Sequence, residues 1–197
     1  MPNLNVILAQ IWTDLQAGAT DSHDSFHTPV LGTLDAHGDN SLRTVVVRGI
    51  EPQTRAIICH TDVRATKVEE IRQRGSVSWL FYAAERKIQI RAQATAIIHH
   101  GDALALQHWQ QTSLSSRRAY LATAAPGSEL AEPGSGLPPH LTSRSPDQTE
   151  SEAGRPNFAV IVSTIELLDW LYLDSKGHRR AQFSWTGGKF EGRWIIP

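Results

Sequence analysis

Hydrophobic residues recur at helical spacing near the start of the chain and alternate with polar residues over much of the remainder. Apolar side chains between positions 4 and 15 predict an amphipathic helix over 4–17, which Gly18 ends. Shorter helices are predicted from Asp62, as the cap, to about Arg74, and in the regions 102–111 and 115–123. Alternating β-branched and aromatic residues predict strands at 26–35, 41–50, 56–60, 77–82, 87–98, 179–185 and 190–196, and a long apolar run covers 158–173.

The order of these elements indicates the fold class. About seven or eight strands are interrupted by helices only at the start and in the middle, whereas a doubly wound parallel sheet alternates strands and helices. The sequence also contains no glycine-rich dinucleotide motif and no P-loop. We therefore predict a mainly β (α+β) protein, an antiparallel barrel with peripheral helices, that forms a single domain over 1–197.

One segment departs from this pattern. Pro, Gly, Ser and Glu dominate between about 125 and 156, where large apolar residues almost vanish. Such a segment buries too little apolar area to offset the entropy lost on ordering. We expect a long flexible flap at about 125–156.

Composition narrows the possible functions. A formal net charge of -1 disfavours a general binder of nucleic acid or membrane surfaces, so any anion site must be local. The single cysteine, Cys59, excludes an intramolecular disulfide and is expected to be a buried apolar residue. No apolar stretch reaches the roughly 20 residues of a spanning helix, and the first residues lack the order of a secretory signal. We expect a cytoplasmic protein, and no histidine cluster predicts a metal site.

Two arginines, Arg43 and Arg48, lie in the strand predicted at 41–50. Alternation along a strand places residues 43 and 48 on opposite faces. They can serve one ligand only if the strand bends or ends near Arg48, which Gly49 permits.

A second polar cluster lies where a strand is predicted to end and a helix to begin. Thr61, Thr66 and Lys67 place two hydroxyls and an ammonium beside the free N–H groups of a helix start, a combination that suits phosphate. In the alternative interpretation, Lys67 pairs with Glu69 or Glu70 in an ordinary helix.

Four short motifs together resemble the pyridoxamine 5'-phosphate oxidase family of FMN-binding split barrels, in its broad branch of related proteins. The similarity runs from about Phe26 to the C-terminus. The motifs are Arg43-Thr-Val-Val-Val-Arg48, His60-Thr61 with Thr66-Lys67, Lys87-Ile-Gln-Ile-Arg-Ala92, and Trp170 with His178-Arg-Arg180. Two positions depart from the family pattern, because Arg48 stands in place of a lysine and Thr66 in place of a basic residue.

The resemblance implies an antiparallel split β-barrel that binds FMN at the boundary of a homodimer, with both chains in contact with each flavin. It implies flavin contacts from Arg43, Val46, Val47, Arg48, His60, Thr61, Arg64, Thr66, Lys67, Trp170 and Arg180, and from either Lys87 or Gln89. Parity along the strand leaves the choice between Lys87 and Gln89 open. Trp170 could equally be a core residue.

The resemblance also implies a substrate site, formed by Arg48, Lys176 and His178. Lys176 stands where the family has an arginine, and the middle helices do not reproduce the family's set for a pyridoxal-type phosphate. Flavin binding is therefore better supported than oxidation of pyridoxamine phosphate. No residue is identified as catalytic.

These observations predict an FMN-dependent oxidoreductase that acts on an unidentified small molecule. The alternative is a non-catalytic protein that carries flavin or haem, in which His60 or His178 would be the haem ligand. The phosphate-binding set at 61–67 favours FMN, because haem does not need it.

Overall fold

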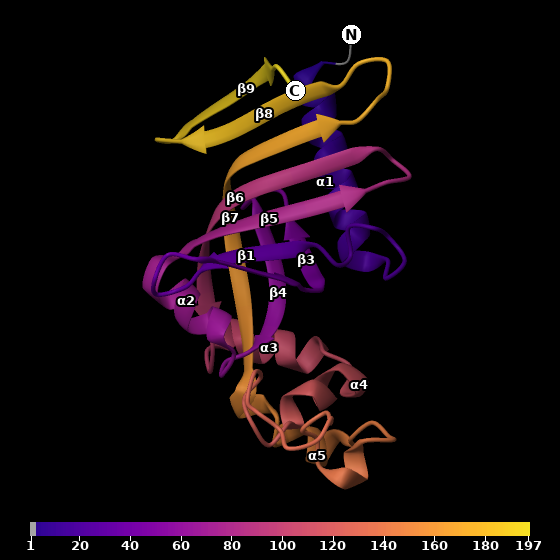
Figure 1. The fold of residues 1–197 in the computed structure, drawn as a ribbon, viewed down its shortest axis with the longest axis vertical. Helices are drawn as coiled ribbons and strands as arrows, with labels where there is room; N and C mark the ends of the chain where they lie inside the picture. Colours follow the sequence, from indigo (N-terminus) through magenta and orange to yellow (C-terminus); the bar gives the residue numbers. More distant parts are fainter. Residues whose placement is uncertain (1–2) are drawn as a thin grey trace.

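A computed structural model describes residues 3–197, without the side chain of Thr186. The described strands form one antiparallel sheet in the order β2-β1-β5-β6-β7-β4-β3, and β8 and β9 extend the sheet from β7 (Figure 1). The strands are β1 (Val30–Leu34), β2 (Asn40–Thr44), β3 (Val47–Glu51), β4 (Ala56–Asp62), β5 (Ser76–Ala83), β6 (Ile88–His99), β7 (Phe158–Tyr172), β8 (Arg179–Thr186) and β9 (Lys189–Ile195). The sheet does not close, which agrees with the predicted antiparallel split barrel.

The long strand β7 belongs to both parts of the split sheet. Its first half pairs with β4 and its second half with β8, while β6 follows it over nearly its whole length. A register shift between Gln93 and Ala94 marks the place where β6 bends. The two long strands therefore join the lower part of the sheet in Figure 1 to the upper part.

The predicted first helix is present as α1 (Leu4–Thr20). Its buried side chains Ile7, Ile11 and Leu15 recur at helical spacing and pack into the main core of the sheet. Close packing explains Gly18, because a Cβ atom at this position would lie 2.7 Å from the Cβ atom of Phe26.

The strand predicted at 41–50 is two strands, β2 and β3. The break falls at Val45 and Val46, because β2 pairs with β1 whereas β3 pairs with β4, at the other edge of the sheet. A bulge follows at Arg48, between the paired residues Val47 and Gly49. The chain therefore bends near Arg48, as a shared ligand site would require.

Helix α2 (Thr66–Arg74) begins later than predicted. Ala65 is its N-cap, and Asp62 instead accepts hydrogen bonds from the backbone and side chain of Arg64. Gly75 ends the helix in the left-handed conformation, as its position in the sequence suggests.

A helical lobe, residues 103–157, hangs below the sheet in Figure 1. It contains α3 (Ala103–Gln111), α4 (Leu114–Arg117), α5 (Gln148–Glu152) and the 3₁₀ turns Arg118–Leu121, Pro139–Leu141 and Arg155–Asn157. A second core, with Trp109, Tyr120 and Phe158 at its centre, joins the lobe to the sheet.

Arg117 is buried inside this lobe and bonds to several of its segments. The residue is 3 % exposed, and its guanidinium lies over the ring of Trp109 and donates hydrogen bonds to the carbonyl oxygens of Trp109 and Thr112 and to Ser151. Within the segment 125–156, which we expected to be a flexible flap, the hydrogen bond to Ser151 ties α5 to Arg117, and the flexibility of the segment stays a prediction. Hydrogen bonds from this buried charge contribute stability in a segment that has few large apolar residues to bury.

No helix among residues 3–197 is both long enough and apolar enough to cross a membrane.

Candidate functional site

Residues predicted from two motifs meet in one cleft between the sheet and the helical lobe. The cleft has a volume of about 490 Å³, within the usual range for small-molecule sites. We call it the β4 cleft, and its walls are Thr44, Val45, Val46, Arg48, His60, Thr61, Asp62, Ala65, Lys67, Thr112, Ser115, Ser116, Ala119, Tyr120 and Pro126. Of the predicted residues, the structure thus brings together Val46, Arg48, His60, Thr61 and Lys67.

One end of the β4 cleft combines a helix start with a free cation. Ala65 gives α2 no side-chain cap, so the first N–H groups of the helix are open to a ligand. Lys67 is half-buried beside them, and its ammonium donates to the Thr61 hydroxyl at 3.2 Å. Burial, and next the charge of Arg43, lower the pKa of Lys67. A desolvated ammonium at an open helix N-terminus is suited to an anion.

The two carboxylates near Lys67 are already paired. Glu70 lies 3.3 Å from the guanidinium of Arg43, and Asp62 lies 2.7 Å from that of Arg64. The alternative in which Lys67 pairs with Glu69 or Glu70 is therefore not what the structure shows. Arg43 and Arg64 are engaged within the chain, so neither presents a free cation to the cleft.

His60, on the wall of the β4 cleft, contacts a second histidine, His108. His60 Nε2 lies 3.1 Å from Nδ1 of His108, and the ring of His60 packs edge-on against Phe158. Burial, the neighbouring His108 and the charge of Arg48 lower the pKa of His60 to about 3, and burial also lowers the pKa of His108. Both rings are consequently neutral at physiological pH.

Cys59 lies behind this wall, fully buried as expected. Burial raises the pKa of its thiol to about 12, which leaves it protonated and unreactive.

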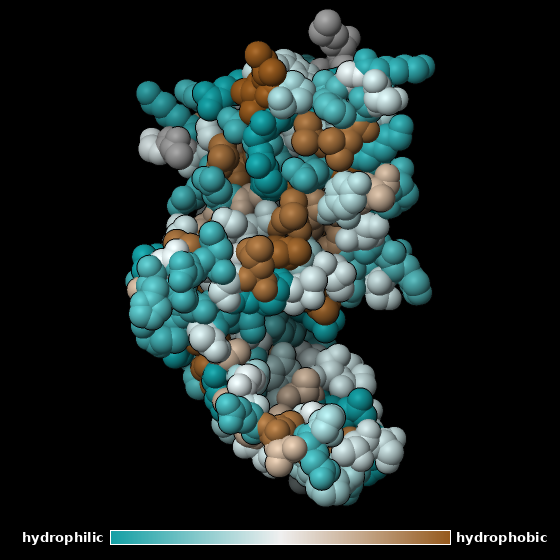
Figure 2. All heavy atoms as spheres, in the orientation of Figure 1, coloured by the Kyte–Doolittle hydropathy of each residue, from teal (hydrophilic) through white to brown (hydrophobic). Residues whose placement is uncertain are grey.

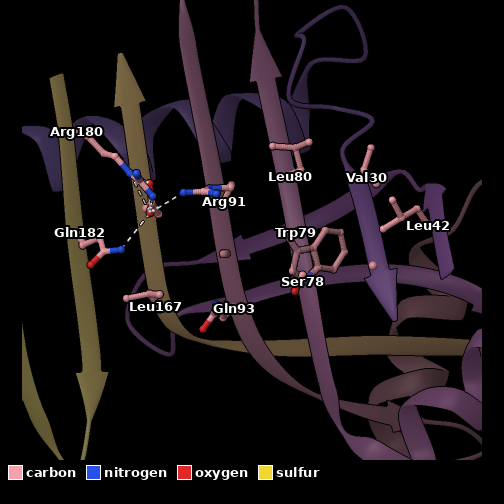
Figure 3. A pocket seen from close by; sticks show the side chains of 13 residues that line it. Val30, Leu42, Ser78, Trp79, Leu80, Arg91, Gln93, Leu167, Arg180 and Gln182 are labelled. Carbon is pink, nitrogen blue, oxygen red and sulfur yellow. Dashed lines mark hydrogen bonds and ion pairs between the residues drawn. The ribbon is translucent and has the colours of Figure 1, made fainter. Parts of the chain in front are cut away.

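A second group of predicted residues lies on a different surface, one face of the sheet. Residues paired across neighbouring strands share a face, so Gln89, Arg91, Asp169, Arg180 and Gln182 lie side by side. In Figure 3, Arg91, Arg180 and Gln182 converge on one carboxylate, that of Asp169. We call this surface the β5–β6 face, and its other residues include Val30, Leu42, Ser78, Leu80, Tyr82, Gln93 and Leu167.

Asp169 is 5 % exposed, yet it is charged. Burial opposes its ionisation, but hydrogen bonds from Arg180 and Gln182 hold its pKa below the ordinary value. Two guanidiniums around one carboxylate leave a surplus positive charge on the β5–β6 face.

The structure separates the two candidates Lys87 and Gln89. Lys87 lies in the turn before β6, with a positive φ of 55°, and faces Asp174 at 4.0 Å. Gln89 lies within β6, on the same face as Arg91. Gln89 is therefore the one of the pair that shares a surface with Arg180.

Other predicted residues lie outside both surfaces. Trp170 is 7 % exposed and stacks on Tyr172 in the main core, on the side of the sheet opposite Arg180. Val47 is also buried in that core. Lys176 and His178 lie in the exposed turn between β7 and β8, and their role in substrate binding stays a prediction.

Comparison with known proteins indicates the family that this chain resembles. Residues 9–100 match the family described as pyridoxamine 5'-phosphate oxidase, FMN-binding domain. A pyridoxine/pyridoxamine 5'-phosphate oxidase 2 from Arabidopsis thaliana is 29% identical over 183 residues, or 88% of this chain and 87% of the relative. Through residues 9–100 and this relative, the chain is similar to the pyridoxamine 5'-phosphate oxidase-related, FMN-binding family. Proteins of this family are often dimeric and bind small molecules.

Solved structures confirm the fold. A pyridoxamine 5'-phosphate oxidase-related, FMN-binding protein from Nostoc punctiforme PCC 73102 has a TM-score of 0.76 at 20% identity, over 96% of both chains. PhzG from Burkholderia lata 383, solved with tetrahydrophenazine-1-carboxylic acid, has a TM-score of 0.74 at 17% identity, over 100% of this chain and 94% of PhzG.

FMN is the cofactor of this family, and the β4 cleft fits it. The observation that tests the fit is Lys67, a half-buried ammonium whose hydrogen bond within the chain goes to a hydroxyl. The flavin phosphate supplies the anion that this ammonium, the Thr61 hydroxyl and the start of α2 need.

Several residues of the two surfaces were not predicted. Arg91 shares the parity of Gln89 along its strand, a signal that could have identified it. Asp169 and His108 gave no comparable signal, because their partners come from distant parts of the chain.

Proposed function

We propose that this protein is an FMN-dependent oxidoreductase that acts on a small molecule as a homodimer. Each FMN would lie between the β4 cleft of one copy and the β5–β6 face of the other. The observation that carries the proposal is the half-buried Lys67 ammonium at the open start of α2, which forms no ion pair with a side chain that the structure describes. It supports a binding site for the phosphate of a flavin mononucleotide at this end of the cleft.

The residues predicted to bind FMN near the β4 cleft have different proposed roles. Lys67 and Thr61, which line the cleft, would bind the phosphate together with Thr66 at the start of α2. Arg43 and Arg64 would act indirectly, because they pair with the two carboxylates that would otherwise neutralise Lys67. Val46 at the break between β2 and β3, and Arg48 at the bulge, would line the ring.

The second copy would complete the site with Gln89 and Arg180. In a single chain these residues lie on a surface separate from the β4 cleft. The same face exposes Leu42, Leu80 and Tyr82, of which Leu42 is 70 % exposed. Figure 2 shows apolar side chains gathered over the part of the sheet formed by β1 and β5. A self-complementary interface would cover them.

Bound FMN supplies the two-electron redox chemistry. Arg48 of one copy and Arg180 of the other would stabilise the negative charge of the reduced ring. The helical lobe forms one wall of the cleft and would exclude water from the bound substrate.

Haem carriage, the alternative from the sequence, has less support. His60 Nε2 is engaged by His108, and His178 lies in an exposed turn outside both surfaces. A non-catalytic flavin carrier differs from the proposal only in its reactivity.

The test is anaerobic reduction of the FMN-loaded protein by reduced nicotinamide, by pyridoxamine phosphate and by simple amines. We expect at least one donor class to bleach the bound flavin faster than free FMN. Binding of FMN without accelerated reduction by any of them would favour the carrier, and failure to bind FMN would exclude both functions.

A further inference from the structure

The β4 cleft continues into a side pocket at the helical lobe, at the end away from Lys67. The side pocket has a volume of about 370 Å³. Its walls are Arg48, His60, His108, Gln111, Thr112, Ser113 and Ser116. Because Arg48, His60, Thr112 and Ser116 also line the β4 cleft, a ligand here would lie against a flavin bound in that cleft.

Arg48 is the one cationic side chain among the residues that line the side pocket, and none of them is acidic. The next guanidinium along the lobe is unavailable, because Arg117 is turned inward and bound to carbonyl oxygens. Arg118 donates to the carbonyl oxygen of Arg144. The side pocket therefore carries a single positive charge.

The histidine pair adds hydrogen-bonding groups without adding charge. Two neutral rings joined through His60 Nε2 and His108 Nδ1 leave one ring N–H donor and one acceptor nitrogen for a ligand. Gln111, Thr112, Ser113 and Ser116 add amide and hydroxyl groups around them.

We infer that the substrate is a small organic monoanion, a carboxylate rather than a phosphate ester, held by Arg48 in the side pocket. The inference rests on the proposed function. One guanidinium matches one carboxylate in charge and in its two-pronged geometry. A phosphate ester carries about 1.5 to 2 negative charges at neutral pH, and the described residues that line the side pocket offer no second cation to balance them.

Two probes of matched shape test the inference: benzoate and phenyl phosphate, with benzamide as the uncharged control. Each is titrated into FMN-loaded protein at neutral pH and followed through the change in the flavin absorption spectrum. We expect benzoate to bind at least about tenfold more tightly than either other probe, the effect of one charged hydrogen bond. Equal or tighter binding of phenyl phosphate, or no saturable binding of benzoate, would overturn the inference.

Two variants sharpen the test. His108→Arg adds a second cation to the side pocket and should shift the preference toward phenyl phosphate by at least about tenfold. Leu106→Arg places the same charge at an exposed position of α3 outside the side pocket, and should leave the preference unchanged. An unchanged preference in His108→Arg would contradict the single-charge argument.

FMN uptake is measured first in every variant, which separates the two proposals. Wild-type protein that takes up no FMN refutes both the proposed function and the inference. Protein that binds FMN but prefers phenyl phosphate refutes the inference alone.

Discussion

Lys67 illustrates how one side chain can mark a ligand site. An ammonium that loses water on folding normally gains a carboxylate, yet the carboxylates near Lys67 are held by Arg43 and Arg64. The positive charge is therefore available to a ligand.

Replacement of Lys67 by Ala should weaken FMN binding by about 1–3 kcal/mol, the usual contribution of a charged hydrogen bond. Flavin fluorescence quenching during titration of the apoprotein measures the affinity. Arg72→Ala removes an exposed cation from the same helix and is the matched control. Equal affinities of Lys67→Ala and Arg72→Ala for FMN would remove Lys67 from the site.

His60 should make stability depend on pH. Its native pKa of about 3 lies below the value of about 6.5 expected in the unfolded chain, so only the unfolded state takes up the proton between these values. The destabilisation is absent above about pH 6.5 and grows as the pH falls.

Between pH 7 and pH 5, the wild type should lose about 1–2 kcal/mol more of its free energy of unfolding than His60→Phe. Urea unfolding at both pH values measures the difference. His23→Phe, at a side chain that is 94% exposed, should follow the wild type. Parallel losses in the wild type and His60→Phe would contradict the neutral histidine pair.

For single residues, the sequence indicated which side chains line the β4 cleft better than it indicated which side chains they pair with or pack against. Thr61 and Lys67 were identified because local spacing places them at one helix start. The engagement of Arg43 by Glu70, and the burial of Trp170, depend on packing between distant elements that a local motif does not report.

At the scale of elements, the helical lobe is built around one buried charge. Arg117 links α3, α4 and α5 through hydrogen bonds that end on backbone carbonyl oxygens and on Ser151. Composition predicts a flexible flap at 125–156 because large apolar residues are scarce there, and it gives no sign of the hydrogen bond between Arg117 and Ser151; the flexibility of the flap stays a prediction.

Arg117→Met should lower the free energy of unfolding by about 2–4 kcal/mol, since several buried acceptors lose their donor. It should also speed proteolysis within 125–156. Arg118→Met removes a side chain at the surface of the same turn, whose hydrogen bond goes to the carbonyl oxygen of Arg144, and should change stability by less than about 0.5 kcal/mol. Equal stabilities of the two variants would show that the lobe does not depend on Arg117.

Strand periodicity predicted the antiparallel fold but not the division of 41–50 into β2 and β3. Each half is a good strand, and only the sheet order, which sends β2 and β3 to opposite edges, requires the break at Val45 and Val46. That break forms part of the wall of the β4 cleft.

At the scale of the whole molecule, the proposal requires two copies. Predicted residues lie on two surfaces of one chain, and one of these surfaces exposes an apolar patch. The resemblance to a dimeric family predicted this arrangement, whereas spacing along one chain could not assign residues to different copies.

Leu80→Glu places a charge in the middle of the β5–β6 face and should weaken dimerisation by about 3 kcal/mol or more, with a parallel loss of FMN affinity. Size-exclusion chromatography with light scattering measures the mass. Val6→Glu, on the exposed side of α1, should leave the dimer intact. A monomeric wild type, or a dimeric Leu80→Glu at the same concentration, would contradict the proposed interface.

The most direct test of the shared site is a mixed dimer of Lys67→Ala and Arg180→Gln chains, isolated through two different affinity tags. If each FMN contacts the β4 cleft of one copy and the β5–β6 face of the other, both defects fall in one site and the second site is intact. FMN titration should then show one wild-type site per mixed dimer, although both parent homodimers bind FMN weakly. A mixed dimer that binds FMN as weakly as its parents would contradict the account.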